Sequence, residues 1–70
     1  MDYLMHFTVE GLYDADRTAL MKKELLAMEG VKDVQIAGVD RVSIIYDPTK
    51  VIPSKLTASM RSVGVRTHTG

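Results

Sequence analysis

The spacing of apolar residues switches repeatedly along this chain, and each switch predicts a new element of secondary structure. Within Tyr3–Glu10, the apolar residues Met5, Phe7 and Val9 alternate with polar ones, which predicts a strand that buries one face. Gly11 follows and ends the alternation. The chain therefore opens with a strand that has one apolar face and one polar face.

The stretch from Ala15 to Glu29 predicts an amphipathic helix, because strong helix formers dominate it. Met21, Leu25 and Met28 recur at intervals of four and three positions, so they lie on one stripe of the helix. Leu20 widens that stripe. We therefore expect this helix to be buried along these side chains.

Short polar residues, proline and glycine mark the ends of two predicted helices. Asp14 or Asp16 can cap the first helix, because a short carboxylate accepts hydrogen bonds from the free N–H groups of a first turn. Gly30 can end that helix in a left-handed conformation. The second helix is expected to begin at Pro53, which suits a first helical turn, and to end at Gly64.

Three further strands follow from the same patterns. The second strand covers residues 31–36, and its irregular spacing near Lys32-Asp33 indicates a turn or bulge. A turn at residues 37–40 leads into a third, alternating strand, Arg41–Tyr46. Residues Val65–His68 are expected to form a short fourth strand.

The second helix supplies the last layer of the predicted fold. Leu56 and Met60 lie four positions apart on its apolar stripe, and Ile52, just before it, is expected to pack inward. The order of elements is then strand, helix, strand, strand, helix, strand. It predicts an α+β fold, a ferredoxin-like βαββαβ sandwich in which two helices cover one face of a four-stranded antiparallel sheet.

Length and composition restrict the classes of protein to which the chain can belong. Seventy residues make one domain, residues 1–70. Nine basic and nine acidic residues cancel, which argues against nucleic-acid binding. The absence of cysteine and of any bilayer-spanning apolar run predicts a cytoplasmic protein without membrane insertion. The sequence is compatible with a whole protein and with an excised domain.

Apolar residues, glycines and a Tyr-Asp-Pro turn recur at a characteristic spacing along nearly the whole chain. These positions are Gly11, Met21, Leu25, Met28, Gly30, Val31, Val34, Ile36, Val42, Tyr46, Asp47, Pro48, Leu56, Met60 and Gly64. In them the chain resembles the heavy-metal-associated domain, the fold of small copper chaperones and of N-terminal modules of metal-pumping ATPases. The resemblance implies this architecture and a setting in metal transport or homeostasis. Framework positions say little about function.

The same resemblance implies a metal loop between the first strand and the first helix, which in that family reads Gly-Met-x-Cys-x-x-Cys. Here Leu12 stands at the methionine position, and Asp14 and Arg17 stand at the cysteine positions. Cu(I) prefers soft sulfur ligands, and an arginine keeps its proton and positive charge, so it cannot bind a metal ion. The chain is therefore expected to have the framework of a metal carrier with a degenerate loop that binds soft metal weakly or not at all.

Three interpretations of Asp14 and Arg17 are open. The two side chains can form an ion pair that ties down the loop. Alternatively, Asp14 is an N-cap and Arg17 lies in solvent. In the third interpretation, the helix N-terminus and Arg17 together contact an anionic group or a partner.

His6 and His68 form an alternative candidate metal site. If the fourth strand pairs with the first so that Val65 lies opposite Val9, His68 lies opposite His6 on the face away from the helices. Two imidazoles across a strand pair could bind a divalent ion weakly, and Asp14 could supply an oxygen ligand. We expect no cofactor, and this weak divalent-metal site is the alternative to a degenerate loop.

The pattern of side chains does not indicate catalysis, so the chain is expected not to be an enzyme. The open sheet face also lacks the aromatic residues of an RNA-recognition module. We expect a monomer or weak homodimer that contacts another protein, such as a metal-transport component. Self-association through sheet edges, or binding of a small ligand, is the further alternative. The expected contact residues are Tyr13, Arg17, Lys22 and Lys23.

Overall fold

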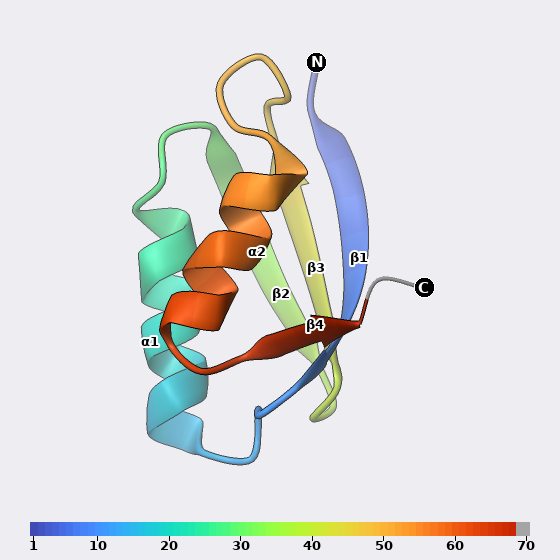
Figure 1. The fold of residues 1–70 in the computed structure, drawn as a ribbon. Helices are drawn as coiled ribbons and strands as arrows, with labels where there is room; N and C mark the ends of the chain where they lie inside the picture. Colours follow the sequence, from blue (N-terminus) through green and yellow to red (C-terminus); the bar gives the residue numbers. More distant parts are fainter. Residues whose placement is uncertain (69–70) are drawn as a thin grey trace.

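The computed structural model describes residues 1–68 and contains the predicted elements in the predicted order. Both helices lie on one face of a four-stranded sheet, and the other face is open (Figure 1). The fold is thus the ferredoxin-like α+β sandwich that the sequence predicts. Its elements are β1 (Tyr3–Glu10), α1 (Ala15–Leu26), β2 (Val31–Ala37), β3 (Arg41–Tyr46), α2 (Pro53–Ser62) and β4 (Arg66–His68).

The sheet has the strand order β2-β3-β1-β4, and all neighbouring strands are antiparallel. β1 pairs with β3 from Tyr3 to Thr8. On its other side, β1 pairs with the short strand β4 only from Thr8 to Glu10. The two central strands, β3 and β1, therefore make most of the strand pairing, and β4 pairs with one end of β1 only (Figure 1).

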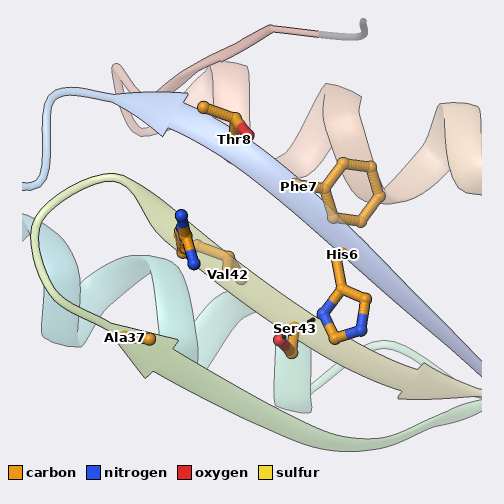
Figure 2. A pocket seen from close by; sticks show the side chains of 7 residues that line it. His6, Phe7, Thr8, Ala37, Val42 and Ser43 are labelled. Carbon is orange, nitrogen blue, oxygen red and sulfur yellow. Dashed lines mark hydrogen bonds between the residues drawn. The ribbon is translucent and has the colours of Figure 1, made fainter.

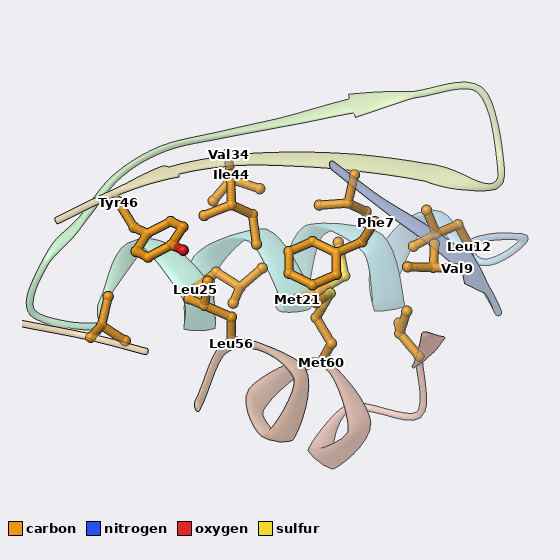
Figure 3. Close-up of a cluster of buried hydrophobic side chains, with 13 residues drawn as sticks. Phe7, Val9, Leu12, Met21, Leu25, Val34, Ile44, Tyr46, Leu56 and Met60 are labelled. Atoms are coloured by element: carbon orange, nitrogen blue, oxygen red, sulfur yellow. The ribbon is translucent and has the colours of Figure 1, made fainter. Parts of the chain in front are cut away.

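The core lies between the sheet and the two helices (Figure 3). Met21 and Leu25 from α1 and Leu56 and Met60 from α2 are fully buried, as their spacing predicts. The buried stripe of α1 is narrower than expected, because Leu20 remains 46% exposed. The buried residues are Phe7, Val9, Leu12, Met21, Leu25, Val34, Val42, Ile44, Tyr46, Val51, Leu56, Met60 and Val65.

Helix α1 ends at Leu26, earlier than the predicted Glu29. The N–H of Met28 donates to the carbonyl of Leu25 at 3.1 Å, a tighter turn than an α-helix allows. Met28 still packs against the core, half-buried, from this turn. Within residues 1–68, neither helix has the length and apolar composition that a membrane span requires.

The predicted irregularity at the start of β2 is confirmed. Val31 lies opposite Tyr46 and Asp33 lies opposite Ile45, so Lys32 is an extra residue in β2. Two residues against one is the count of a β-bulge. After the bulge, β2 and β3 pair regularly up to the hairpin turn, which also lies where the sequence predicts it.

Two predictions near α2 are wrong by a single position. Ile52 is 53% exposed, whereas its neighbour Val51 is buried, so Val51 is the residue that packs inward before the helix. β4 begins at Arg66 instead of Val65. The N–H of Val65 donates to the carbonyl of Met60 at 3.0 Å, so Val65 closes the helix before the sheet pairing begins.

Candidate functional site

The loop between β1 and α1 lies at the same end of the molecule as the turn between α2 and β4 (Figure 1). Gly11 begins the loop with φ +103°, and a Cβ there would lie 3.0 Å from the carbonyl oxygen of Gly64. A left-handed φ and this close approach both favour a glycine at position 11. The close contact between the two loops locates the candidate site.

Leu12 and Tyr13 are adjacent but lie in opposite environments. Leu12 is 6% exposed and belongs to the core cluster, whereas Tyr13 is 81% exposed. Burying a leucine side chain stabilises a fold by roughly 1.5–3 kcal/mol. Leu12, at the methionine position of the family loop, therefore anchors the loop and leaves the Tyr13 ring at its surface.

Asp14 is the N-cap of α1. Its Oδ1 accepts hydrogen bonds from the N–H of Asp16 at 2.9 Å and the N–H of Arg17 at 3.4 Å. Its carbonyl accepts from the N–H and the hydroxyl of Thr18, both at 3.0 Å. A carboxylate at the N-cap accepts hydrogen bonds from otherwise free N–H groups, and its negative charge interacts favourably with the positive end of the helix dipole. The second of the three interpretations is therefore correct for Asp14.

The Arg17 side chain packs on a glycine and does not form an ion pair with Asp14. A Cβ on Gly64, which has φ +87°, would lie 3.4 Å from the Arg17 Cζ, and its nitrogen Nη1 also lies near Gly11. Among residues 1–68, no Asp or Glu carboxylate lies within 4.0 Å of an Arg or Lys nitrogen; the one contact of this kind joins Glu10 to His68 and is an ion pair only when that ring is protonated. The guanidinium thus covers the place where the two loops meet, with its charge unmatched by a close carboxylate in the described chain.

A shallow hollow of about 310 Å³ lies next to Arg17. Two arginines, Arg17 and Arg66, are among its lining residues, as is Glu10, whose carboxylate lies 3.0 Å from the Nε2 of His68. The sequence alone does not indicate a role for Arg66, because its place depends on the register that puts it opposite Glu10. The hollow is lined by Glu10, Gly11, Tyr13, Arg17, Gly64 and Arg66.

These donors do not fit a soft metal ion. The chain contains no cysteine, Leu12 is buried, and the Asp14 carboxylate accepts hydrogen bonds within the first turn of α1. Arg17 adds a positive charge at the same place, which opposes cation binding. Within the described chain, no three His, Asp or Glu side chains cluster closely enough to hold a metal ion.

The two histidines do not lie opposite each other. His68 lies opposite Thr8, because Thr67 pairs with Val9 and shifts the register from the predicted one. Each ring also has another partner: His6 Nδ1 lies 2.8 Å from the hydroxyl of Ser43, and His68 bonds to a glutamate. The predicted cross-strand histidine pair is therefore wrong, and weak binding of a divalent ion by either ring stays a prediction.

Lys22 and Lys23 are exposed on α1, as their place outside the apolar stripe predicts. We call these two lysines, together with Tyr13 and Arg17, the loop face. All four residues are exposed. The loop face therefore has one aromatic side chain and three positive charges available for contact.

Comparison with known proteins identifies the fold and nothing finer. No family model and no curated protein sequence matches the chain. Solved structures do match, among them a CopZ metallochaperone, with 21% identity over 94% of this chain and 100% of that one and a TM-score of 0.87. The chain has the heavy-metal-associated fold.

Two further structures with the heavy-metal-associated fold match this chain with similar identity, coverage and TM-score. The N-terminal domain of a potential copper-translocating P-type ATPase from Bacillus subtilis, solved in its Cu(I)-loaded state, is 24% identical over 96% of this chain and 85% of that one, with a TM-score of 0.88. Oxidized MerP from Ralstonia metallidurans CH34 is 20% identical over 97% and 96%, with a TM-score of 0.87. At these identities the likeness concerns architecture, and function must be argued from the site.

Proposed function

We propose that this chain is a heavy-metal-associated-type domain whose loop contacts another protein and does not carry a soft metal ion. The observation that supports this most is that the fold itself uses both side chains at the cysteine positions. Asp14 caps α1, and Arg17 packs over Gly64. The exposed ring of Tyr13 and the positive charge of Arg17 therefore remain available to contact a partner.

The loop face also suggests the chemistry of the partner. Tyrosine and arginine are enriched among residues that dominate binding at protein interfaces. Three of the four loop-face residues are cationic, so a partner with acidic residues opposite Arg17, Lys22 and Lys23 would associate faster and more selectively. The similar structures include a metallochaperone and a P-type ATPase domain. This favours a component of a metal-transport system as the partner.

Site-specific crosslinking tests this proposal. A photo-reactive phenylalanine analogue at Tyr13 is expected to give one discrete protein adduct in cells of the source organism. The same group at Leu4, which is also exposed but lies on β1, is the matched control and should give none. An adduct from both positions, or from neither, would contradict a specific contact at the loop face.

Charge reversal then tests the role of the lysines. The double substitution K22E/K23E should reduce the yield of the adduct, because it replaces attraction of an acidic partner by repulsion. The matched control K55E reverses an exposed lysine on α2 and should leave the yield unchanged. Equal yields for both variants would show that the lysines of α1 do not contribute.

A metal-binding protein with oxygen and nitrogen ligands is the alternative function. Its candidate ligands are Asp14, His6 and His68, and each of these already makes a hydrogen bond or ion pair in the fold. Titration with Zn(II) and Ni(II), followed residue by residue in NMR spectra, distinguishes the two functions. Saturating shifts at stoichiometric metal would favour the alternative, whereas binding only at high metal concentration favours the interaction domain.

A further inference from the structure

The open face of the sheet has a hollow of about 490 Å³, larger than the hollow beside the loop (Figure 2). It lies on the face away from the helices and is lined by residues 6–8 of β1, whereas the loop begins at Gly11. The backbone of β1 and β3 forms the floor of the hollow, because the side chains of Phe7 and Val42 point to the other face and are buried in the core. The lining residues are His6, Phe7, Thr8, Ala37, Arg41, Val42 and Ser43.

Strand register explains why these side chains come together. Arg41 lies between Thr8 on β1 and Ala37 on β2, so the three form one row across the sheet. In the neighbouring row, His6 lies opposite Ser43. Side chains directly opposite on antiparallel strands are close neighbours. The small methyl group of Ala37 leaves space beside the long arginine side chain.

The pair formed by His6 and Ser43 retains a hydrogen-bond donor for a ligand. Nδ1 of His6 lies 2.8 Å from Oγ of Ser43 (Figure 2). If the serine donates this bond, Nε2 of the neutral ring carries the free N–H; if the histidine donates it, the serine O–H is free. In either tautomer one donor of the pair is left to bind a second acceptor.

Arg41 and Thr8 add donors at the other end of the hollow. Arg41 is exposed, and no carboxylate in residues 1–68 lies within 4.0 Å of its guanidinium. The hydroxyl of Thr8 is likewise not hydrogen-bonded to another group of the described chain. The hollow therefore combines one permanent positive charge with two kinds of neutral donor, and carries no acidic side chain among its lining residues.

We infer that this hollow binds the oxyanion group of a small molecule, a carboxylate or a phosphate. Guanidinium groups bind both through paired N–H donors, and such charge-assisted hydrogen bonds are about twice as strong as neutral ones. Arg41 supplies the charge, while Thr8 and the pair of His6 and Ser43 supply the further donors. This site is separate from the loop face and does not depend on the function proposed for it.

Titration of the ¹⁵N-labelled chain with inorganic phosphate and, separately, with acetate tests the inference at constant ionic strength. Saturable amide shifts are expected at His6, Thr8, Arg41 and Ser43, and small shifts at Tyr13 beside the loop. Saturation with phosphate alone would identify a phosphate-bearing ligand, and saturation with acetate alone a carboxylate-bearing one. Saturation with both supports the shared oxyanion chemistry, and linear shifts with both would overturn it.

Substitutions assign the binding to the hollow. Arg41→Gln is expected to raise the Kd for the probe that saturates by at least about tenfold, because it removes the charged, paired hydrogen bonds of the guanidinium. The matched control Arg61→Gln removes an exposed arginine on α2 and should leave the Kd unchanged. Ser43→Ala provides a second, milder change in the same site. Equal Kd values for R41Q, S43A and R61Q would overturn the assignment.

Discussion

The guanidinium of Arg17 lies over Gly64, so that a Cβ on this glycine would touch Cζ at 3.4 Å. This contact joins the start of α1 to the turn between α2 and β4. The long arginine side chain thereby covers two glycine-containing loops with its stem and its planar head. An ATPase domain solved in a Cu(I)-loaded state has a similar fold; in this chain the side chain of Arg17 covers the loop.

Removing this cover should destabilise the domain slightly. Arg17→Ala is expected to lower the free energy of unfolding by up to about 1 kcal/mol, because packing is lost although the side chain is exposed. Arg61→Ala, at an exposed position of α2, should change it by less than about 0.5 kcal/mol. Urea unfolding of both variants measures the difference. Equal stabilities would contradict a structural role for the contact with Gly64.

The close approach of the two loops predicts a strong effect at Gly11. Gly11→Ala should destabilise the fold by about 2–3 kcal/mol, because it adds backbone strain and places a Cβ 3.0 Å from a carbonyl oxygen of the facing loop. Gly38→Ala is the matched control: it also has positive φ, but its Cβ would meet only an Asp40 side-chain oxygen at 3.7 Å. It should cost about 1–2 kcal/mol. The prediction fails if the control is as costly as G11A.

The capping role of Asp14 is also measurable. Asp14→Ala should reduce stability by about 1 kcal/mol, because the N–H groups of Asp16 and Arg17 lose their acceptor. Asp14→Ser retains a capping oxygen and should retain most of the stability. Thermal unfolding by circular dichroism distinguishes the two. If serine is as destabilising as alanine, the carboxylate has some role other than capping.

Asp47 predicts a stability change in acid. The hydroxyl of Thr49, then its backbone N–H, donates to the Asp47 carboxylate and lowers its pKa below the ordinary value of 3.8. This stabilisation is fully present above the unfolded-state pKa and is lost as the pH falls through the lower, folded-state pKa. Thr49→Val removes one donor, so the folded-state pKa of Asp47 should rise toward 3.8. An NMR titration giving the same pKa in both proteins would contradict this.

Restoring sulfur should restore metal binding. In the double variant D14C/R17C, two thiols replace the cap and the covering arginine, and a thiolate pair suits Cu(I). We expect binding of one Cu(I) per chain, with a loss of stability of about 1–2 kcal/mol from the lost cap and the lost arginine cover. D14S/R17A removes the same side chains without adding sulfur and is the control. If the cysteine variant folds but binds no copper, the loop does not have the geometry that the resemblance implies.

The sequence predicts the parts of the fold that depend on periodicity. Met21 and Leu25 are four positions apart on a helix, Val42 and Ile44 are two apart on a strand, and all four are buried. Each element buries one face, so its buried residues recur with the period of a helix or of a strand. Leu20 and Ile52 were predicted wrongly, since a helix or loop next to a small core has room for only some of the apolar residues near it. Burial at such borders depends on tertiary contacts that periodicity does not contain.

In the candidate site, the sequence predicts only those contacts that join residues close together in the chain. The N-cap at Asp14 follows from residue type and position, because its hydrogen bonds reach only the next turn. The place of His68 and Arg66 depends on the register between β4 and β1, and three strand residues specify register weakly. The contact between Arg17 and Gly64 joins residues far apart in the sequence, so nothing in the local pattern indicates it.

A competition titration with Cu(I) tests the account most directly. The natural chain is mixed with a chromophoric Cu(I) chelator of nanomolar affinity under reducing, oxygen-free conditions, and D14C/R17C serves as the positive control. The account predicts that the chelator keeps its copper in the presence of the natural chain, because Leu12, Asp14 and Arg17 provide no soft ligand. Withdrawal of one equivalent of copper by the natural chain would contradict it.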